Sequence, residues 1–246
     1  MRSILDLEYK EGLFLDLYLP ECEEFDLFVY FHGGGLERGS RKRADIFAKT
    51  LAERGVATAS VDYRLLPEAK FPDFLIDAAD SVRWLKDNIK EYGNMRRIFI
   101  GGSSAGGYIS MMLCFDERYL CGVGISPCEI SAYIHDAGQP TAHYNVLKYS
   151  GIDPRRVIVD ERAPIYFVGT REEYPPMLFI VSDNDMFARY EQTQLMVKTL
   201  EHFGNKENVR LKVMHSAHCK YVYKQDECGN GVLGTVISEF LDDVGF

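Results

Sequence analysis

The chain has 246 residues, of which 46% are hydrophobic and 13% aromatic, so it can bury one sizeable core, and we expect residues 1–246 to form a single domain. Its formal net charge of -9 and pI near 5.2 come from acidic residues spread along the sequence. Because an anionic surface repels phosphate backbones, nucleic acid is excluded as an expected partner.

The beginning of the chain and its cysteines indicate a compartment. The first residues, MRSILDLEYKEG, mix charges with apolar side chains and predict neither a signal peptide nor a membrane span. Six cysteines lie far apart without a CxxC pair, as reduced thiols in the cytoplasm do. Cys114, Cys121 and Cys128 recur every seven residues but fall in different predicted elements, so no metal site is expected.

Strand-like and helix-like segments alternate along most of the chain. Segments 4–9 and 13–19 flank Glu11-Gly12 and predict an antiparallel hairpin at a sheet edge. Six short apolar runs predict buried parallel strands: 25–31, 56–61, 97–100, 119–125, 177–181 and 209–214. Helical periodicity marks five segments: 43–54, 72–91, 105–115, 190–203 and 231–242. The alternation predicts an α/β fold with a mostly parallel sheet flanked by helices.

One connection is too long for a simple crossover. Residues 126–176 contain Pro, Gly and several aromatic residues, which predicts a lid or cap insertion before the penultimate strand. Four aromatic side chains of this insertion are candidates for the wall of a binding pocket, or for core packing: Tyr133, His135, Tyr144 and Tyr149.

A GxSxG motif lies between a predicted strand and a predicted helix, at 102–106. A sharp turn at this place needs glycine two residues before and two residues after the serine, so that the hydroxyl is free. Ser104 occupies that position and Ser103 does not. We therefore expect Ser104 to be the nucleophile, at a helix N-terminus whose amides favour negative charge.

A second glycine motif follows the strand at 25–31. His32 precedes Gly33, Gly34 and Gly35, and glycine lets the main chain approach a ligand with its amides turned inward. The GxxxxGK[ST] pattern of a phosphate loop is absent. We expect the amides of Gly34, Gly35 and Ala105 to form an oxyanion hole, and His32 to brace the loop.

A serine nucleophile needs a histidine base, which in this type of fold follows the last strand. His215 and His218 are the candidates, and the loop position favours His218. The acid that orients the imidazole should follow the penultimate strand, where Asp183 and Asp185 stand. We choose Asp185, with Asp183 as the fallback. The order Ser104, Asp185, His218 is typical of α/β-hydrolases.

The chain resembles the bacterial esterases related to hormone-sensitive lipase, within the α/β-hydrolase superfamily. The resemblance rests on 32–35, on VDYRLLPE at 61–68 with Pro72 after it, on 102–107, and on PPML at 175–178 before Asp185. It implies an eight-stranded sheet, no metal or organic cofactor, and hydrolysis of carboxylic esters. The stretch at 63–68 is expected to be a buried turn in which Arg64 and Glu68 pair.

Three features depart from the family pattern. Ser103 stands where an acidic residue is frequent, Cys219 stands where a glycine follows the histidine, and an N-terminal cap is not evident. These departures affect the substrate rather than the mechanism. The sequence predicts a serine carboxylesterase acting on small esters through an acyl-enzyme; the alternatives are an amidase or peptidase with the same triad, or a non-catalytic protein that binds a small ligand.

Overall fold

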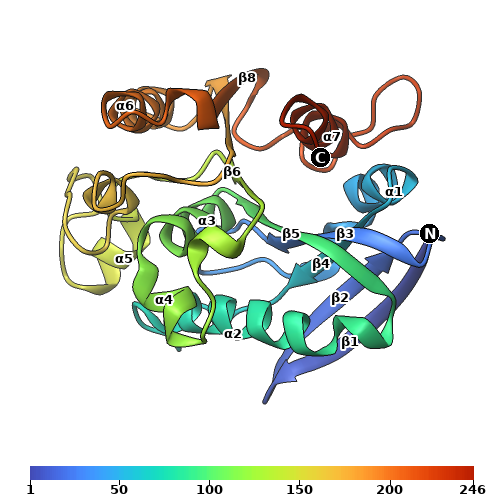
Figure 1. The fold of residues 1–246 in the computed structure, drawn as a ribbon. Helices are drawn as coiled ribbons and strands as arrows, with labels where there is room; N and C mark the ends of the chain where they lie inside the picture. Colours follow the sequence, from blue (N-terminus) through green and yellow to red (C-terminus); the bar gives the residue numbers. More distant parts are fainter.

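A single eight-stranded sheet runs through the computed structural model, which describes residues 1–246 (Figure 1). Its strand order is β1-β2-β4-β3-β5-β6-β7-β8. The strands are β1 (Arg2–Lys10), β2 (Leu13–Leu19), β3 (Glu24–Phe31), β4 (Val56–Val61), β5 (Asn94–Ser103), β6 (Ala132–Asp136), β7 (Met177–Asn184) and β8 (Val209–Ala217). The β1–β2 and β2–β4 pairs are antiparallel and every other pair is parallel, which confirms the predicted edge hairpin and the mostly parallel sheet.

Helices cover both faces of the sheet. They are α1 (Asp45–Glu53), α2 (Asp73–Asn88), α3 (Ala105–Phe115), α4 (Glu117–Gly122), α5 (Tyr144–Tyr149), α6 (Arg189–His202) and α7 (Val232–Asp243). Apolar residues of α2, α3 and α6 join one core cluster, and those of α1 and α7 join another, so the two groups lie on opposite faces. None of these helices has both the length and the apolar character needed to cross a bilayer.

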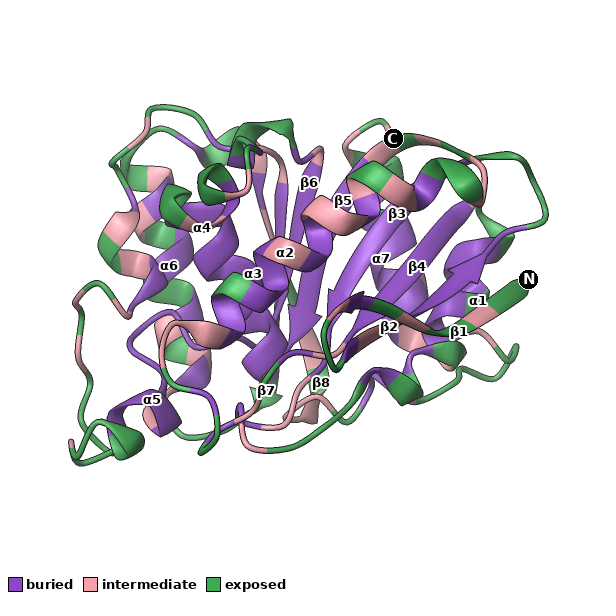
Figure 2. Ribbon diagram, turned by 90° about the horizontal axis from the view of Figure 1, so that it is seen from below, coloured by how far each residue is buried: buried purple, intermediate pink, exposed green.

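The central strands are buried on both faces, because helices pack on each side (Figure 2). Strand β3 lies next to β5, with Phe31 in register with Gly102. The glycine loop 32–35, predicted to form the oxyanion hole (the oxyanion loop), and the turn at Ser104, predicted to be the nucleophile (the nucleophile turn), therefore begin at the same level of two neighbouring strands. The turns after β7 and β8 reach the same edge, since the carboxyl ends of parallel strands share one edge of a sheet.

One predicted strand is wrong. Residues 119–125 were expected to be a strand, but Glu117–Gly122 form helix α4, whose first turn is capped by the Asp116 carboxylate through the amide of Arg118. The sixth strand is β6, which lies inside the predicted insertion 126–176. Only residues 137–176 therefore form the long connection before β7.

The predicted pairing of Arg64 with Glu68 is also wrong. Arg64 instead grips the carboxylate of Asp77 on α2, with Nε and Nη2 donating over 2.7 and 2.8 Å to its two oxygens. Lys10 Nζ donates to the same carboxylate over 2.8 Å, and the Asp77 side chain is fully buried. Glu68 is exposed. The ion pairs thus fasten α2 to the edge hairpin rather than closing a local turn.

Candidate active site

The turn between β5 and α3 holds Ser104 in a strained backbone conformation, with φ 56° and ψ −110°. The turn is crowded: a Cβ atom on Gly106 would lie 1.8 Å from the carbonyl oxygen of Phe31, and one on Gly102 would lie 2.5 Å from the same oxygen. Both flanking positions therefore require glycine. The amide of Ser104 donates over 2.7 Å to the carbonyl of Asp136, which ties the turn to β6.

The structure brings together the three side chains predicted for the triad. His218 Nε2 lies 2.8 Å from Ser104 Oγ, and His218 Nδ1 lies 2.5 Å from Asp185 Oδ1. Ser104 comes from the β5–α3 turn, Asp185 from the loop after β7, and His218 from the loop after β8. Such a chain of hydrogen bonds can carry a proton from the hydroxyl to the imidazole while the carboxylate fixes the ring.

Asp185 is the charged end of this chain. Its side chain is fully buried, which opposes ionisation, but His218 and the amides of Met186 and Ser182 donate hydrogen bonds to it. Together these donors hold the pKa of Asp185 below its usual value. The carboxylate is therefore ionised at neutral pH and fixes the His218 ring with Nδ1–H toward Asp185 and Nε2 free to accept from Ser104.

The alternative residues form a separate pair. His215 Nδ1 lies 2.6 Å from Asp183 Oδ2, and the His215 side chain is 93% exposed. Neither residue contacts Ser104 or His218 through a hydrogen bond. The structure thus places Asp183 and His215 on the surface, where they form a salt bridge when the imidazole is protonated.

The oxyanion loop lies directly against the nucleophile. A Cβ atom on Gly33 would be 3.0 Å from the carbonyl oxygen of Ser103 and 3.3 Å from the Cβ atom of Ser104. Gly34 and Gly35 have φ values of 128° and 69°, and neither amide donates a hydrogen bond within the chain. With the first amide of α3, that of Ala105, these groups are available donors beside the Ser104 hydroxyl.

His32 supports this loop from below. Its Nδ1 donates over 2.8 Å to the carbonyl of Gly33, and its ring stacks on the Tyr63 ring with 4.4 Å between the ring centres. The Tyr63 hydroxyl donates over 2.7 Å to the carbonyl of His32. Burial lowers the pKa of His32, which keeps the ring neutral. The expectation that His32 braces the loop is confirmed.

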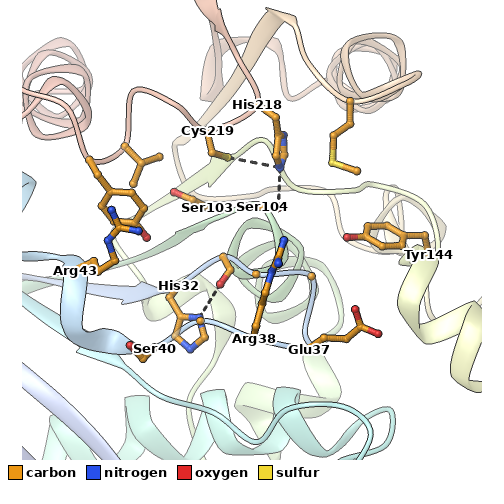
Figure 3. Close-up of a pocket in the computed structure, with 17 residues that line it drawn as sticks. His32, Glu37, Arg38, Ser40, Arg43, Ser103, Ser104, Tyr144, His218 and Cys219 are labelled. Carbon is orange, nitrogen blue, oxygen red and sulfur yellow. Dashed lines mark hydrogen bonds between the residues drawn. The ribbon is translucent and has the colours of Figure 1, made fainter.

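Ser104 and His218 open into a pocket of about 640 Å³ (Figure 3). Its wall includes the oxyanion glycines, Tyr144 from the predicted lid, and Met186, Val222 and Tyr223. The Asn145 side chain donates over 2.6 Å to the carbonyl of Gly35, so the connection 137–176 also holds the oxyanion loop. Sequence reasoning missed Asn145, because nothing local to it signals a contact with residue 35.

The four aromatic candidates of the insertion separate into three groups. Tyr144 lines the pocket, whereas Tyr149 is exposed and its hydroxyl donates over 2.9 Å to Glu37. Tyr133 and His135 are buried in β6 and pack in the core of the sheet, so a pocket role for them is excluded.

A buried carboxyl next to the nucleophile was also missed. Ser103 Oγ donates over 2.5 Å to Asp136 Oδ2, and the Tyr221 hydroxyl donates to Asp136 Oδ1. Burial raises the pKa of Asp136 to about 6, despite these two hydrogen bonds. A carboxyl from β6 therefore contacts Ser103, the position where related esterases frequently carry an acidic residue. Asp136 fell within the predicted insertion, so no signal identified it.

Comparisons with known proteins agree with this fold. A family model described as alpha/beta hydrolase fold matches residues 28–219. The chain is 33% identical over 128 residues to 3-O-acetylpapaveroxine carboxylesterase CXE2 of Papaver somniferum, covering 43% of this chain and 40% of that protein. It is 38% identical over 93 residues to carboxylesterase NlhH of Mycobacterium tuberculosis, covering 37% and 29%. The aligned part thus spans less than half of either relative.

Solved structures match over nearly the whole chain. The esterase Est2 of Thermogutta terrifontis superposes with a TM-score of 0.75 at 21% identity, covering 100% of this chain and 92% of the other. Esterase B of Lactobacillus rhamnosis gives a TM-score of 0.78 at 21% identity, covering 97% and 84%. These likenesses establish the fold, and together with the family match over most of the sequence they show that the chain belongs to the alpha/beta hydrolase fold family.

Proposed function

We propose that the protein is a serine carboxylesterase that hydrolyses small carboxylic esters through an acyl-enzyme on Ser104. The observation that carries this proposal is the continuous contact from Ser104 Oγ through both nitrogens of His218 to Asp185, at 2.8 and 2.5 Å. Both curated relatives named above are carboxylesterases, which supports the same reaction class.

In the first half-reaction, His218 Nε2 takes the Ser104 proton as Oγ attacks the ester carbonyl. The amides of Gly34, Gly35 and Ala105 donate to the oxyanion that forms, and Asp185 stabilises the imidazolium. His218 then gives its proton to the departing alkoxide, which leaves an acyl group on Ser104. In the second half-reaction, water loses a proton to His218 and attacks the acyl carbon. The bond to Ser104 Oγ then breaks, His218 returns the proton to Oγ, and the acid is released.

We further propose that residues 1–246 act as one domain in which 137–176 is the lid of this site. Tyr144 in the pocket wall and the Asn145 bond to Gly35 support this role. The lid predicted from the sequence, 126–176, contains strand β6, so the lid proposed here is the shorter segment 137–176. Six free cysteines support a cytoplasmic location for the enzyme.

An activity-based phosphonate probe tests the proposal directly, because it reacts only with a serine that its base has activated. The wild-type protein should become labelled, Ser104→Ala should not, and the neighbouring Ser103→Ala should still be labelled. Equal labelling of all three proteins would contradict the proposal. Turnover of a matched ester and anilide then separates an esterase from an amidase, and a wild-type protein that the probe does not label would favour a binding protein.

A further inference from the structure

We propose that the substrate is an ester that carries a carboxylate, bound by Arg38 and Arg43 in the pocket of Ser104. This inference rests on the proposed esterase function and adds the chemical class of its substrate. It begins from the charges in the pocket wall, which are two arginines and one glutamate.

The glutamate is already neutralised by neighbouring groups. Glu37 accepts from Lys148 Nζ over 2.8 Å and from the Tyr149 hydroxyl over 2.9 Å. These two bonds hold the pKa of Glu37 below its usual value, so the pair is fully formed at neutral pH. Glu37 is therefore not the partner of either arginine, and the wall has an excess of positive charge.

The salt bridges of this segment are formed by Arg41 and Lys42, and neither Arg38 nor Arg43 forms one, although the chain carries an excess of carboxylates. The contrast with their neighbour is sharp: Arg41 is buried and bound to Asp6, Asp16 and Asp62. Two arginines that line a pocket and have no carboxylate partner keep their guanidinium donors free for an anion from solution.

Both arginines are exposed residues that line the same pocket as Ser104 and His218. The side chain of Arg38 passes over the oxyanion loop, with its Cγ 3.2 Å from the place where a Cβ on Gly34 would stand. Arg43 ends the short 3-10 helix Arg41–Arg43, and its guanidinium carbon lies 4.3 Å from the centre of the Tyr223 ring, which also lines the pocket. Figure 3 shows both guanidinium groups in the pocket that contains Ser104 and His218.

A planar guanidinium binds a carboxylate through two parallel hydrogen bonds, which fixes orientation as well as position. A substrate anchored in this way at one end places its ester carbonyl against Ser104 with little loss of further freedom. Two cations in the pocket also attract an anion that the net charge of -9 would otherwise repel. The arrangement thus selects anionic esters against neutral esters of the same shape.

Two matched substrate pairs test this selection. Monoethyl glutarate and ethyl glutaramate differ in charge on the acyl side, while 4-acetoxybenzoate and 4-acetoxybenzamide differ on the alcohol side. We expect kcat/KM to favour the carboxylate over the amide by about 10-fold in at least one pair at low ionic strength, after correction for hydroxide-catalysed hydrolysis. The pair that shows the preference tells which side of the ester the arginines bind, and added salt should reduce it.

The double variant Arg38→Gln/Arg43→Gln should bring that ratio to about one, because both cations are gone. Arg2→Gln is a control for net charge: Arg2 is exposed on β1 outside the pocket, and its loss gives half the charge change of the double variant without touching the site. A wild-type preference for the neutral ester in both pairs, or a ratio that survives the double variant, would overturn the inference.

Calorimetry with Ser104→Ala keeps the inference apart from the proposed function. This variant should bind the carboxylate of the preferred pair about 10-fold more tightly than its amide, and the added arginine substitutions should abolish the difference. If none of the four esters turns over faster with wild type than with Ser104→Ala, the esterase proposal fails, and the binding ratio within each pair still decides the arginine inference. Equal affinity for the carboxylate and the amide would then contradict it.

Discussion

The carbonyl of Asp136 accepts the amide of Ser104 over 2.7 Å, while the side chain of the same aspartate binds Ser103. One residue of β6 thus holds both serines of the nucleophile turn, one through its backbone and one through its carboxyl group. The strained conformation of Ser104 persists because the neighbouring strand opposes its relaxation.

Asp185 and Asp183 form a matched pair for mutation. Asp185→Asn should lower kcat by about 10⁴-fold, as removal of the orienting carboxylate does in serine protease triads, because the amide no longer fixes the His218 tautomer. Asp183→Asn should leave kcat near the wild-type value, since Asp183 binds only the exposed His215 and the amide of Ser216. Steady-state kinetics on one neutral ester measures both, and equal losses would show that the assignment of the acid is wrong.

Asp136 should make folding depend on pH in an unusual direction. Its pKa is raised from 3.8 to about 6 in the folded state, so the folded protein binds the proton more tightly than the unfolded chain. The stabilisation is complete below pH 3.8 and is lost as pH rises through 6, a change of about 3 kcal/mol.

Asp136→Asn removes this titration. Urea denaturation from pH 4 to pH 8 measures the free energy of unfolding of both proteins. The wild type should become less stable relative to the variant as pH rises. A difference that is constant over this range would contradict the raised pKa. Asp80→Asn, at a partly exposed carboxyl on α2, serves as the control for mutating an aspartate.

His135 should contribute to acid unfolding. The side chain is buried among Tyr133 and Phe179, its Nε2 has no hydrogen-bond partner, and burial lowers its pKa from 6.5 to about 3. Stability is therefore complete above pH 6.5 and falls as pH drops toward 3, by about 3 kcal/mol at pH 4.

His135→Phe should abolish this part of the loss. At pH 7 the protein should stay close to the wild type in stability, because removal of the unpartnered Nε2 offsets the loss of the 2.9 Å hydrogen bond between Nδ1 and the Ser110 hydroxyl. His143, whose pKa burial also lowers to about 3, retains its own contribution in this variant. Thermal unfolding at pH 4 and pH 7 gives the comparison, with the exposed His202→Gln as control. An unchanged acid sensitivity in His135→Phe would contradict the assignment.

Asp77 and Glu68 distinguish the observed ion pair from the one expected. Asp77→Ala should lower the free energy of unfolding by about 2 kcal/mol, because Arg64 and Lys10 both lose a buried acceptor but remain partly exposed themselves. Glu68→Ala should change it by less than about 0.5 kcal/mol, as expected at an exposed position. Chemical denaturation at pH 7 measures both, and the reverse ranking would favour the pairing within the turn.

The contact between Ser104, His218 and Asp185 was predictable, because the backbone geometry of the two glycine-containing turns requires recognisable sequence motifs. A Cβ atom on the glycines around Ser104 or on Gly33, Gly34 and Gly35 would lie only 1.8 to 3.3 Å from neighbouring atoms. Glycine is therefore required at these positions, and this requirement makes the two motifs visible in the sequence. The loops after β7 and β8 followed from strand order alone, and this placed Asp185 and His218 at the right edge.

The errors have the opposite origin. Strand β6 is short and ends in two buried polar residues, His135 and Asp136, so its pattern did not indicate a strand. Residues 119–125 are apolar enough for a strand but form a short helix after the Asp116 cap. The partner of Arg64 comes from α2 rather than from its own turn, and long-range contacts of this kind leave no local signal.

The register of Phe31 with Gly102 has a mechanical consequence. The proposed oxyanion donors follow β3 and the proposed nucleophile follows β5, and these two strands are hydrogen-bonded along their length. The two groups therefore cannot separate unless the hydrogen bonds between β3 and β5 break. His218 and Asp185 instead lie in the loops that follow β8 and β7, outside the hydrogen-bonded sheet. A change of length in those loops would therefore move the imidazole and its carboxylate, while the proposed nucleophile and oxyanion donors would stay in place.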